Sequence, residues 1–163
     1  MLRRVLTGPS LILAAVGFLS AQGVPTPESH FGFEIGSEQN LANWTELTAY
    51  YEVLAQTSAR VKVDTLGLTT MGRPFVMLTV TSEENQDRLS ELHDIQMRLA
   101  DPRRVSGDEE LQELLAAGRT VVLITHGIHS TEVGGPQTAA PLLHRLASSN
   151  EERVLEILDN VIL

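Results

Sequence analysis

The feature that most constrains the fold of this chain is the unbroken apolar run Thr120–Thr125, which is rich in β-branched residues. A continuous run of this kind predicts a strand that is covered on both faces of a sheet. The following segment 136–147 has a helical pattern with Pro136 in its first turn. Pro141 lies inside that segment and predicts either a kink or a later helix start. A second helix and the apolar segment 160–163 complete a strand–helix–strand unit, whose two strands are expected side by side in a right-handed crossover.

Upstream of this unit the sequence alternates between helical and extended patterns. Asn43, followed three residues later by Glu46, is typical of a capping box at the start of a helix. Segments 60–68 and 75–80 have extended patterns, and the stretch 69–74 between them contains a glycine and a proline, which favour a turn. These two segments therefore predict an antiparallel hairpin.

Start and stop signals predict two more helical segments and mark the start of the second helix of the strand–helix–strand unit. One spans 83–100 and is stopped by the Asp-Pro pair that follows it. Ser106 with Glu109, and Ser149 with Glu152, have the spacing of a capping box before an apolar helical pattern. Together with the strands, these helices predict an α/β fold, a mixed β-sheet with helices on both faces. Because the last strand is broken off after three apolar residues, we expect the sheet to be incomplete at the C-terminus.

The N-terminal residues 1–23 have the layout of a secretory signal peptide. A positive start is followed by the short apolar run Leu11–Leu19 and by small residues at Ala21 and Gly23, and cleavage after either of these two fits the pattern. The apolar run is too short for a bilayer-spanning helix, so we expect an exported protein without a stable membrane anchor. The alternatives are a buried N-terminal helix or a membrane anchor. Residues 24–40 are predicted as an extended lead-in to a domain over 41–163.

The acidic composition limits the partners of the chain. The sequence contains 21 Asp and Glu residues against 12 Lys and Arg, and the net charge is −9. This excess argues against nucleic acid, whose phosphates bind basic patches, and against an anionic membrane surface. Cysteine is absent, so an exported domain must be held together by its core, by a metal ion or by both.

A cluster of potential metal ligands directly follows the apolar run. Segment 126–132 reads His-Gly-Ile-His-Ser-Thr-Glu, at the carboxyl end of a predicted strand, where open α/β sheets place their sites. His129 and Glu132 offer one imidazole nitrogen and one carboxylate oxygen, which suit catalytic zinc, and a third protein ligand must come from elsewhere. His126 would complete a triad, but a chain that turns from a strand into a helix cannot easily aim three side chains at one point. We predict His126 to lie behind the ligands or to serve in packing, and an ordinary solvated pair is the alternative for His129 and Glu132.

The order of these elements resembles the N-terminal part of the zinc carboxypeptidases, the carboxypeptidase A-like metallopeptidases. The resemblance rests on segment 127–132 after the strand and on the turn Gly72-Arg73-Pro74 between the first two strands. It implies that His129 and Glu132 are the first two ligands of a Zn²⁺ ion. The family's third zinc histidine, its carboxylate-binding arginines and its catalytic glutamate lie further downstream and have no match here, so no catalytic residue is assigned within this chain.

Three functions are compatible with this sequence. The first is an exported zinc metallocarboxypeptidase that hydrolyses C-terminal peptide bonds of peptide substrates by a zinc-activated water. Residues 41–163 would then be the N-terminal part of its catalytic domain, an inactive fragment without the third ligand and the catalytic base. The second is a zinc amidohydrolase of the same fold that deacylates small N-acyl amino acids. The third is a non-catalytic binding module that keeps the fold without metal.

Overall fold

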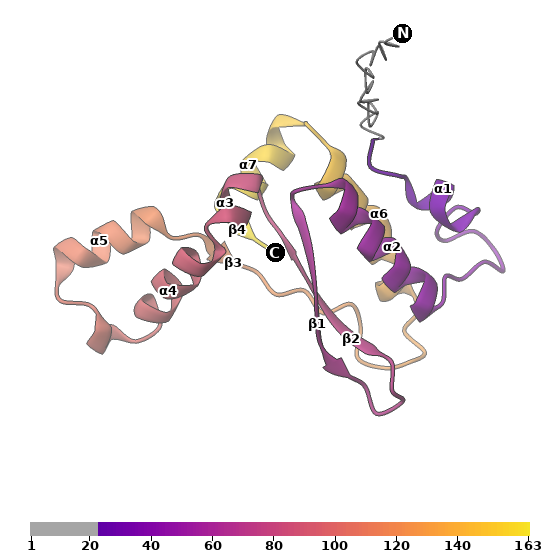
Figure 1. Cartoon of the computed structure of the whole chain (residues 1–163), viewed down its shortest axis with the longest axis horizontal. Coiled ribbons are helices and arrows are strands. Elements are labelled where there is room, and N and C mark those ends of the chain that lie inside the picture. The colour runs from indigo at the N-terminus through magenta and orange to yellow at the C-terminus, as the bar shows by residue number, and fades with distance from the viewer. Residues whose placement is uncertain (1–22) are drawn as a thin grey trace, which may run out of the picture.

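The computed structural model describes residues 23–163 (Figure 1). The predicted signal peptide therefore lies outside the described residues, except for Gly23. The helices are α1 (Pro27–Phe31), α2 (Trp44–Thr57), α3 (Glu83–Asp87), α4 (Leu89–Leu99), the 3₁₀ turn η1 (Pro102–Arg104), α5 (Asp108–Ala117), α6 (Gly134–Ser148) and α7 (Glu152–Asn160). The strands are β1 (Val61–Leu68), β2 (Pro74–Val80), β3 (Thr120–Val121) and β4 (Val161–Ile162). None of the described helices is both long enough and apolar enough to cross a membrane.

Strands β1 and β2 form an antiparallel hairpin in which Val61 lies opposite Val80. In its turn, the Thr69 N–H donates to the Arg73 carbonyl at 2.8 Å, and the Gly72 N–H donates to the Thr69 carbonyl at 2.8 Å. Gly72 has a φ of 70°, a left-handed conformation that glycine adopts without a steric penalty. The hairpin predicted from the sequence is thus confirmed.

Leu163 joins this hairpin to a second pair of strands. β3 and β4 run parallel, with Thr120 opposite Val161, which confirms the strand–helix–strand prediction. Leu163, directly after β4, exchanges two backbone hydrogen bonds of 2.9 Å with Val80 at the end of β2. Such a reciprocal pair is the mark of antiparallel neighbours. Two two-stranded sheets, β1-β2 and β3-β4, are therefore joined through Leu163 into the mixed order β1-β2-β4-β3.

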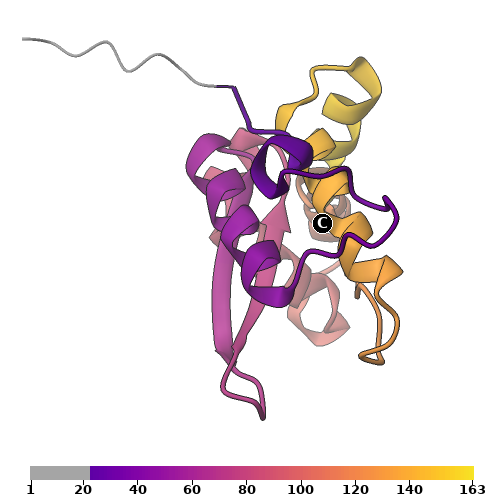
Figure 2. The same cartoon turned by 90° about the vertical axis from the view of Figure 1, so that its right-hand side faces the viewer.

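The end of β4 contacts two apolar cores, because successive residues of a strand point to opposite faces. Leu163 packs against the larger core, which is built mainly from α2, α6 and α7. Ile162 packs against a smaller core from α4 and α5. Figure 1 shows α4 and α5 to the left of the strands and α2 to the right, and Figure 2 shows α2 and α6 side by side. Helices on both faces of a mixed α/β sheet are as predicted.

The predicted central strand is much shorter than the apolar run that suggested it. Only Thr120 and Val121 lie in β3, and the last ladder bond runs from the Val122 N–H to the Ile162 carbonyl at 2.9 Å. β4 offers only two residues for pairing, so beyond Val122 no other described strand pairs with the run. Leu123 is consequently 81% exposed. The prediction that the whole run is covered on both faces is wrong for the described residues.

Helix α2 begins as predicted. The Asn43 side chain accepts hydrogen bonds from the N–H groups of Thr45 and Glu46, and the Glu46 carboxylate accepts the Asn43 N–H at 2.7 Å. This reciprocal capping box satisfies amide groups that have no partner inside the helix. One face of α2 then enters the larger core through Leu47, Tyr50, Tyr51 and Leu54.

The other two predicted capping boxes do not form. Helix α5 starts after Gly107, and the Ser106 N–H bonds to the Glu110 carboxylate instead. Helix α7 starts after Glu151, because Ser149 already ends α6 and its hydroxyl accepts the Glu151 N–H at 3.1 Å. Both serines therefore lie in turns before the helices, and the helices begin one and two residues later than the sequence predicts.

The helix predicted over 83–100 is divided at Arg88 into α3 and α4. Asn85 of α3 is buried, and its side-chain amide donates at 3.0 Å to the carbonyls of Leu158 and Asp159 at the end of α7. The Ser82 N–H also donates to the Leu158 carbonyl at 3.0 Å. These contacts tie α3 to α7 and satisfy carbonyls that lack partners inside that helix. Helix α3 is thus held against the end of α7.

Residues 24–40 differ from the extended lead-in predicted from the sequence, because α1 forms within them. The Tyr50 hydroxyl donates to the Pro25 carbonyl at 2.8 Å. Phe31 packs against the larger core from the same segment. Burial raises the pKa of Tyr50 well above its usual range, so its hydroxyl keeps the proton that makes this bond. The segment is therefore part of the packed structure.

Helix α6 runs from Gly134 to Ser148, with Pro136 in its first turn as predicted. Pro141 lies inside this helix and has no N–H to donate, which costs one helical hydrogen bond. Ala140 and Leu143 beside it are buried in the larger core, and this packing holds the helix through the proline. A later helix start, one of the two alternatives at Pro141, is wrong.

Candidate metal centre

The segment between β3 and α6 carries the predicted metal ligands. Gly127 has a φ of 115°, which redirects the chain as it leaves the extended run. The Glu132 N–H then donates to the His129 carbonyl at 3.0 Å and closes a tight turn. Helix α6 follows directly. The turn therefore presents His129 and Glu132 from one short stretch of backbone.

The Glu132 carboxylate is held by the backbone of its own turn. Oε2 accepts hydrogen bonds from the N–H groups of Ile128 at 2.8 Å and His129 at 3.1 Å. Oε1 lies 2.7 Å from the His129 Nδ1. The hydrogen bond to the His129 ring, followed by those from the two backbone N–H groups, lowers the pKa of Glu132 to about 2. The carboxylate is therefore ionised near neutral pH, as a metal ligand must be.

The donor atoms of this pair fit a zinc ion. An imidazole nitrogen and a carboxylate oxygen are both zinc ligands, and here they lie next to each other. Both side chains face solvent, with His129 72% and Glu132 47% exposed, so a metal ion has access to them. Oε2 is occupied by two backbone N–H groups, so Oε1 is the carboxylate atom left for a metal ion, which would replace the hydrogen bond between Oε1 and His129 Nδ1. The two residues proposed from the sequence are thus brought together.

His126 differs from this pair in its environment. Its side chain is half-buried, whereas His129 and Glu132 are exposed. Residues 23–163 contain no group of three His, Cys, Asp or Glu side chains that could hold a metal ion. Residues 1–22 contain none of these four residue types. This chain therefore offers two neighbouring ligands.

Gln137 is a residue of this region that the sequence analysis missed. Its side-chain amide donates to the Ala42 carbonyl at 2.8 Å and accepts the Ala42 N–H at 3.0 Å. Both bonds are buried, and they anchor the first turn of α6 to the segment before α2. A glutamine among the alanines and leucines of α6 was the available signal, because a polar side chain on a buried helix face needs a partner.

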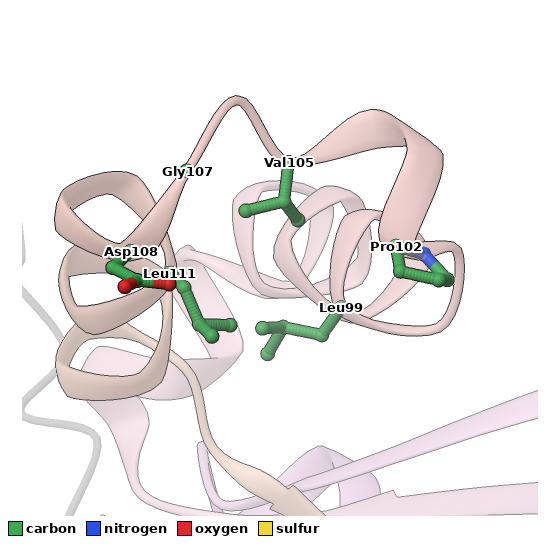
Figure 3. Close-up of a pocket in the computed structure, with 6 residues that line it drawn as sticks. All are labelled: Leu99, Pro102, Val105, Gly107, Asp108 and Leu111. Carbon is green, nitrogen blue, oxygen red and sulfur yellow. The ribbon is translucent and has the colours of Figure 1, made fainter.

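The apolar hollow in Figure 3 is separate from this site. It has a volume of about 220 Å³ and is lined by residues of α4, η1, α5 and the loop before α5. Leu99 and Leu111 face each other across it (Figure 3). Asp108 is its sole ionisable lining residue. The hollow therefore has no set of metal ligands.

Comparison with known proteins agrees with this geometry. The sequence pattern of the zinc carboxypeptidase family matches residues 47–163, from α2 to the end of β4 and through the His129–Glu132 turn. The chain belongs to the zinc carboxypeptidase family. Membership confirms the resemblance seen in the sequence and makes the chain a metallopeptidase-type protein, with zinc and peptide substrates implied by the family. No curated protein sequence and no solved structure matches the chain.

Proposed function

We propose that this zinc carboxypeptidase contributes His129 and Glu132 as two protein ligands of a catalytic zinc ion that removes C-terminal residues from peptides. The observation that carries the proposal is the 2.7 Å approach of His129 Nδ1 to Glu132 Oε1, with Glu132 Oε2 held by two backbone N–H groups. Backbone hydrogen bonds of this kind keep a carboxylate charged and oriented for metal binding.

The residues of this chain have distinct parts in that function. When bound, zinc supplies an activated water and polarises the scissile carbonyl. Glu132 would supply a carboxylate oxygen and its negative charge. His129 would bind the metal through Nδ1, so the ring must carry no proton on that atom; the proton is released to solvent or lies on Nε2. The third ligand, the catalytic base and the groups that bind the substrate carboxylate are proposed to come from outside these 163 residues. A protein limited to them is therefore expected to be inactive.

The proposal is tested on the gene product, meaning the whole protein encoded by the open reading frame that contains residues 1–163. We expect it to release the C-terminal amino acid of a peptide with a free carboxylate, and to leave the same peptide with a C-terminal amide intact. A chelator should abolish the release and added zinc should restore it. Release is measured by amino-acid analysis, and the protein of residues 1–163 is the matched control.

The same assay separates the alternative functions. Hydrolysis of N-acyl amino acids without release from peptides would identify a deacylase of the same fold. A folded protein that binds no zinc and has neither activity would favour a binding module. Either result contradicts the carboxypeptidase proposal.

Export is a separate part of the proposal and rests on the sequence of residues 1–23. Expressed in a bacterium with its native N-terminus, the protein is expected outside the cytoplasm without about its first two dozen residues. N-terminal sequencing of the exported fraction checks this. A sequence that still begins at Met1 in that fraction would contradict cleavage at Ala21 or Gly23.

A further inference from the structure

The backbone of α6 makes an unusually close approach to the segment that leads into the metal-ligand turn. A methyl group placed on Gly135 would lie 2.6 Å from the carbonyl oxygen of His126 and 2.9 Å from its carbonyl carbon. It would lie 3.5 Å from the Gly127 nitrogen. The first two distances are far below van der Waals contact, so any side chain at this position must displace backbone.

Helix α6 is held in place on its side of this contact. Gln137, two residues later, is locked to Ala42 by hydrogen bonds of 2.8 and 3.0 Å. Ala139 and Ala140 follow and are buried in the larger core. Within the described residues, His126 and Gly127 make no backbone–backbone hydrogen bond outside helices and strands, and they belong to neither. The segment 126–127 is therefore the part that moves.

Displacement of segment 126–127 would shift the adjoining backbone that holds His129 and Glu132. Gly127 is followed by Ile128 and His129, whose N–H groups hold Glu132 Oε2 at 2.8 and 3.1 Å. We infer that Gly135 is a positioning residue: its missing side chain lets α6 press against the backbone of His126 and Gly127 and so fixes the turn that carries His129 and Glu132. The zinc part of this inference rests on the proposed function, whereas the position of the turn does not.

Gly134 provides a matched control in the same helical turn. A methyl group placed on Gly134 meets nothing within 4 Å. Both substitutions, Gly134→Ala and Gly135→Ala, add one methyl group and raise helix propensity by the same amount. Their effects therefore differ only through the contact with segment 126–127.

The test uses the gene product and compares the two variants with the wild type. Amide hydrogen exchange is measured without metal, and zinc affinity is measured by titration. In Gly135→Ala we expect exchange at Ile128 and His129 to be faster by about tenfold, while buried amides of α2 keep their wild-type rates. We expect its zinc dissociation constant to rise about 10- to 100-fold. Gly134→Ala should match the wild type in both measurements.

Each outcome decides the inference. Equal exchange at Ile128 and His129 in the two variants overturns it, whatever their zinc affinities. If the wild type binds no zinc, the proposed function fails, and amide exchange still decides the role of Gly135. If Gly135→Ala does not fold, the wild type is tested for a nuclear Overhauser contact between the Gly135 α-protons and the Gly127 amide proton. Its presence supports the close approach, and its absence overturns it.

Discussion

Alanine at either His129 or Glu132 is expected to remove zinc and activity together from the gene product. His129→Ala deletes the nitrogen ligand, and Glu132→Ala deletes the oxygen ligand with its negative charge. Loss of a direct ligand leaves two protein ligands of the three that catalytic zinc sites use. Zinc affinity should therefore fall by more than the 10- to 100-fold typical of changes around the ligands. Metal content and peptide hydrolysis are measured on the same preparations.

His126→Ala is the matched control for this pair, because it removes an imidazole from the segment that leads into the same turn. We expect it to keep its zinc, with losses of about 10- to 100-fold in affinity or activity at most. Loss of zinc in His126→Ala together with retention in His129→Ala would show that the ligands are assigned to the wrong histidine.

Leu158→Ala is expected to cause a large loss in the free energy of unfolding. Leu158 is 0% exposed and packs in the larger core from α7. Removing a buried leucine side chain costs about 2–5 kcal/mol through lost burial and the cavity left behind. The free energy of unfolding of the 163-residue protein, measured by denaturant titration followed by circular dichroism, checks this value.

Leu123→Ala is the control for that prediction, with the same chemical change at an exposed site. Leu123 is 81% exposed, so its truncation should change the free energy of unfolding by no more than about 0.5 kcal/mol. Equal losses from Leu123→Ala and Leu158→Ala would show that the apolar run is buried in solution, as its sequence pattern predicts.

Local patterns in the sequence were sufficient for much of the fold and for the ligand pair. The capping box of Asn43 and the hairpin with its turn glycine depend on residues close in the sequence. The parallel pairing of β3 with β4 follows from the order of strand, helices and strand. His129 and Glu132 lie three residues apart in one turn, so their approach also follows from local geometry.

Tertiary contacts decided the remaining features. The helix predicted over 83–100 is divided at Arg88, and Asn85 on its first part bonds to the end of α7, more than seventy residues away. Within the described residues, the pairing of the apolar run with β4 ends at the bond from the Val122 N–H to the Ile162 carbonyl. Gly135 is distinguished from Gly134 only by the carbonyl of His126 against it. The sequence by itself thus determined most of the elements and the approach of His129 to Glu132 through short-range chemistry. Only the tertiary structure decided where elements end and which backbone packs against the His129–Glu132 turn, because those features depend on groups brought together by folding.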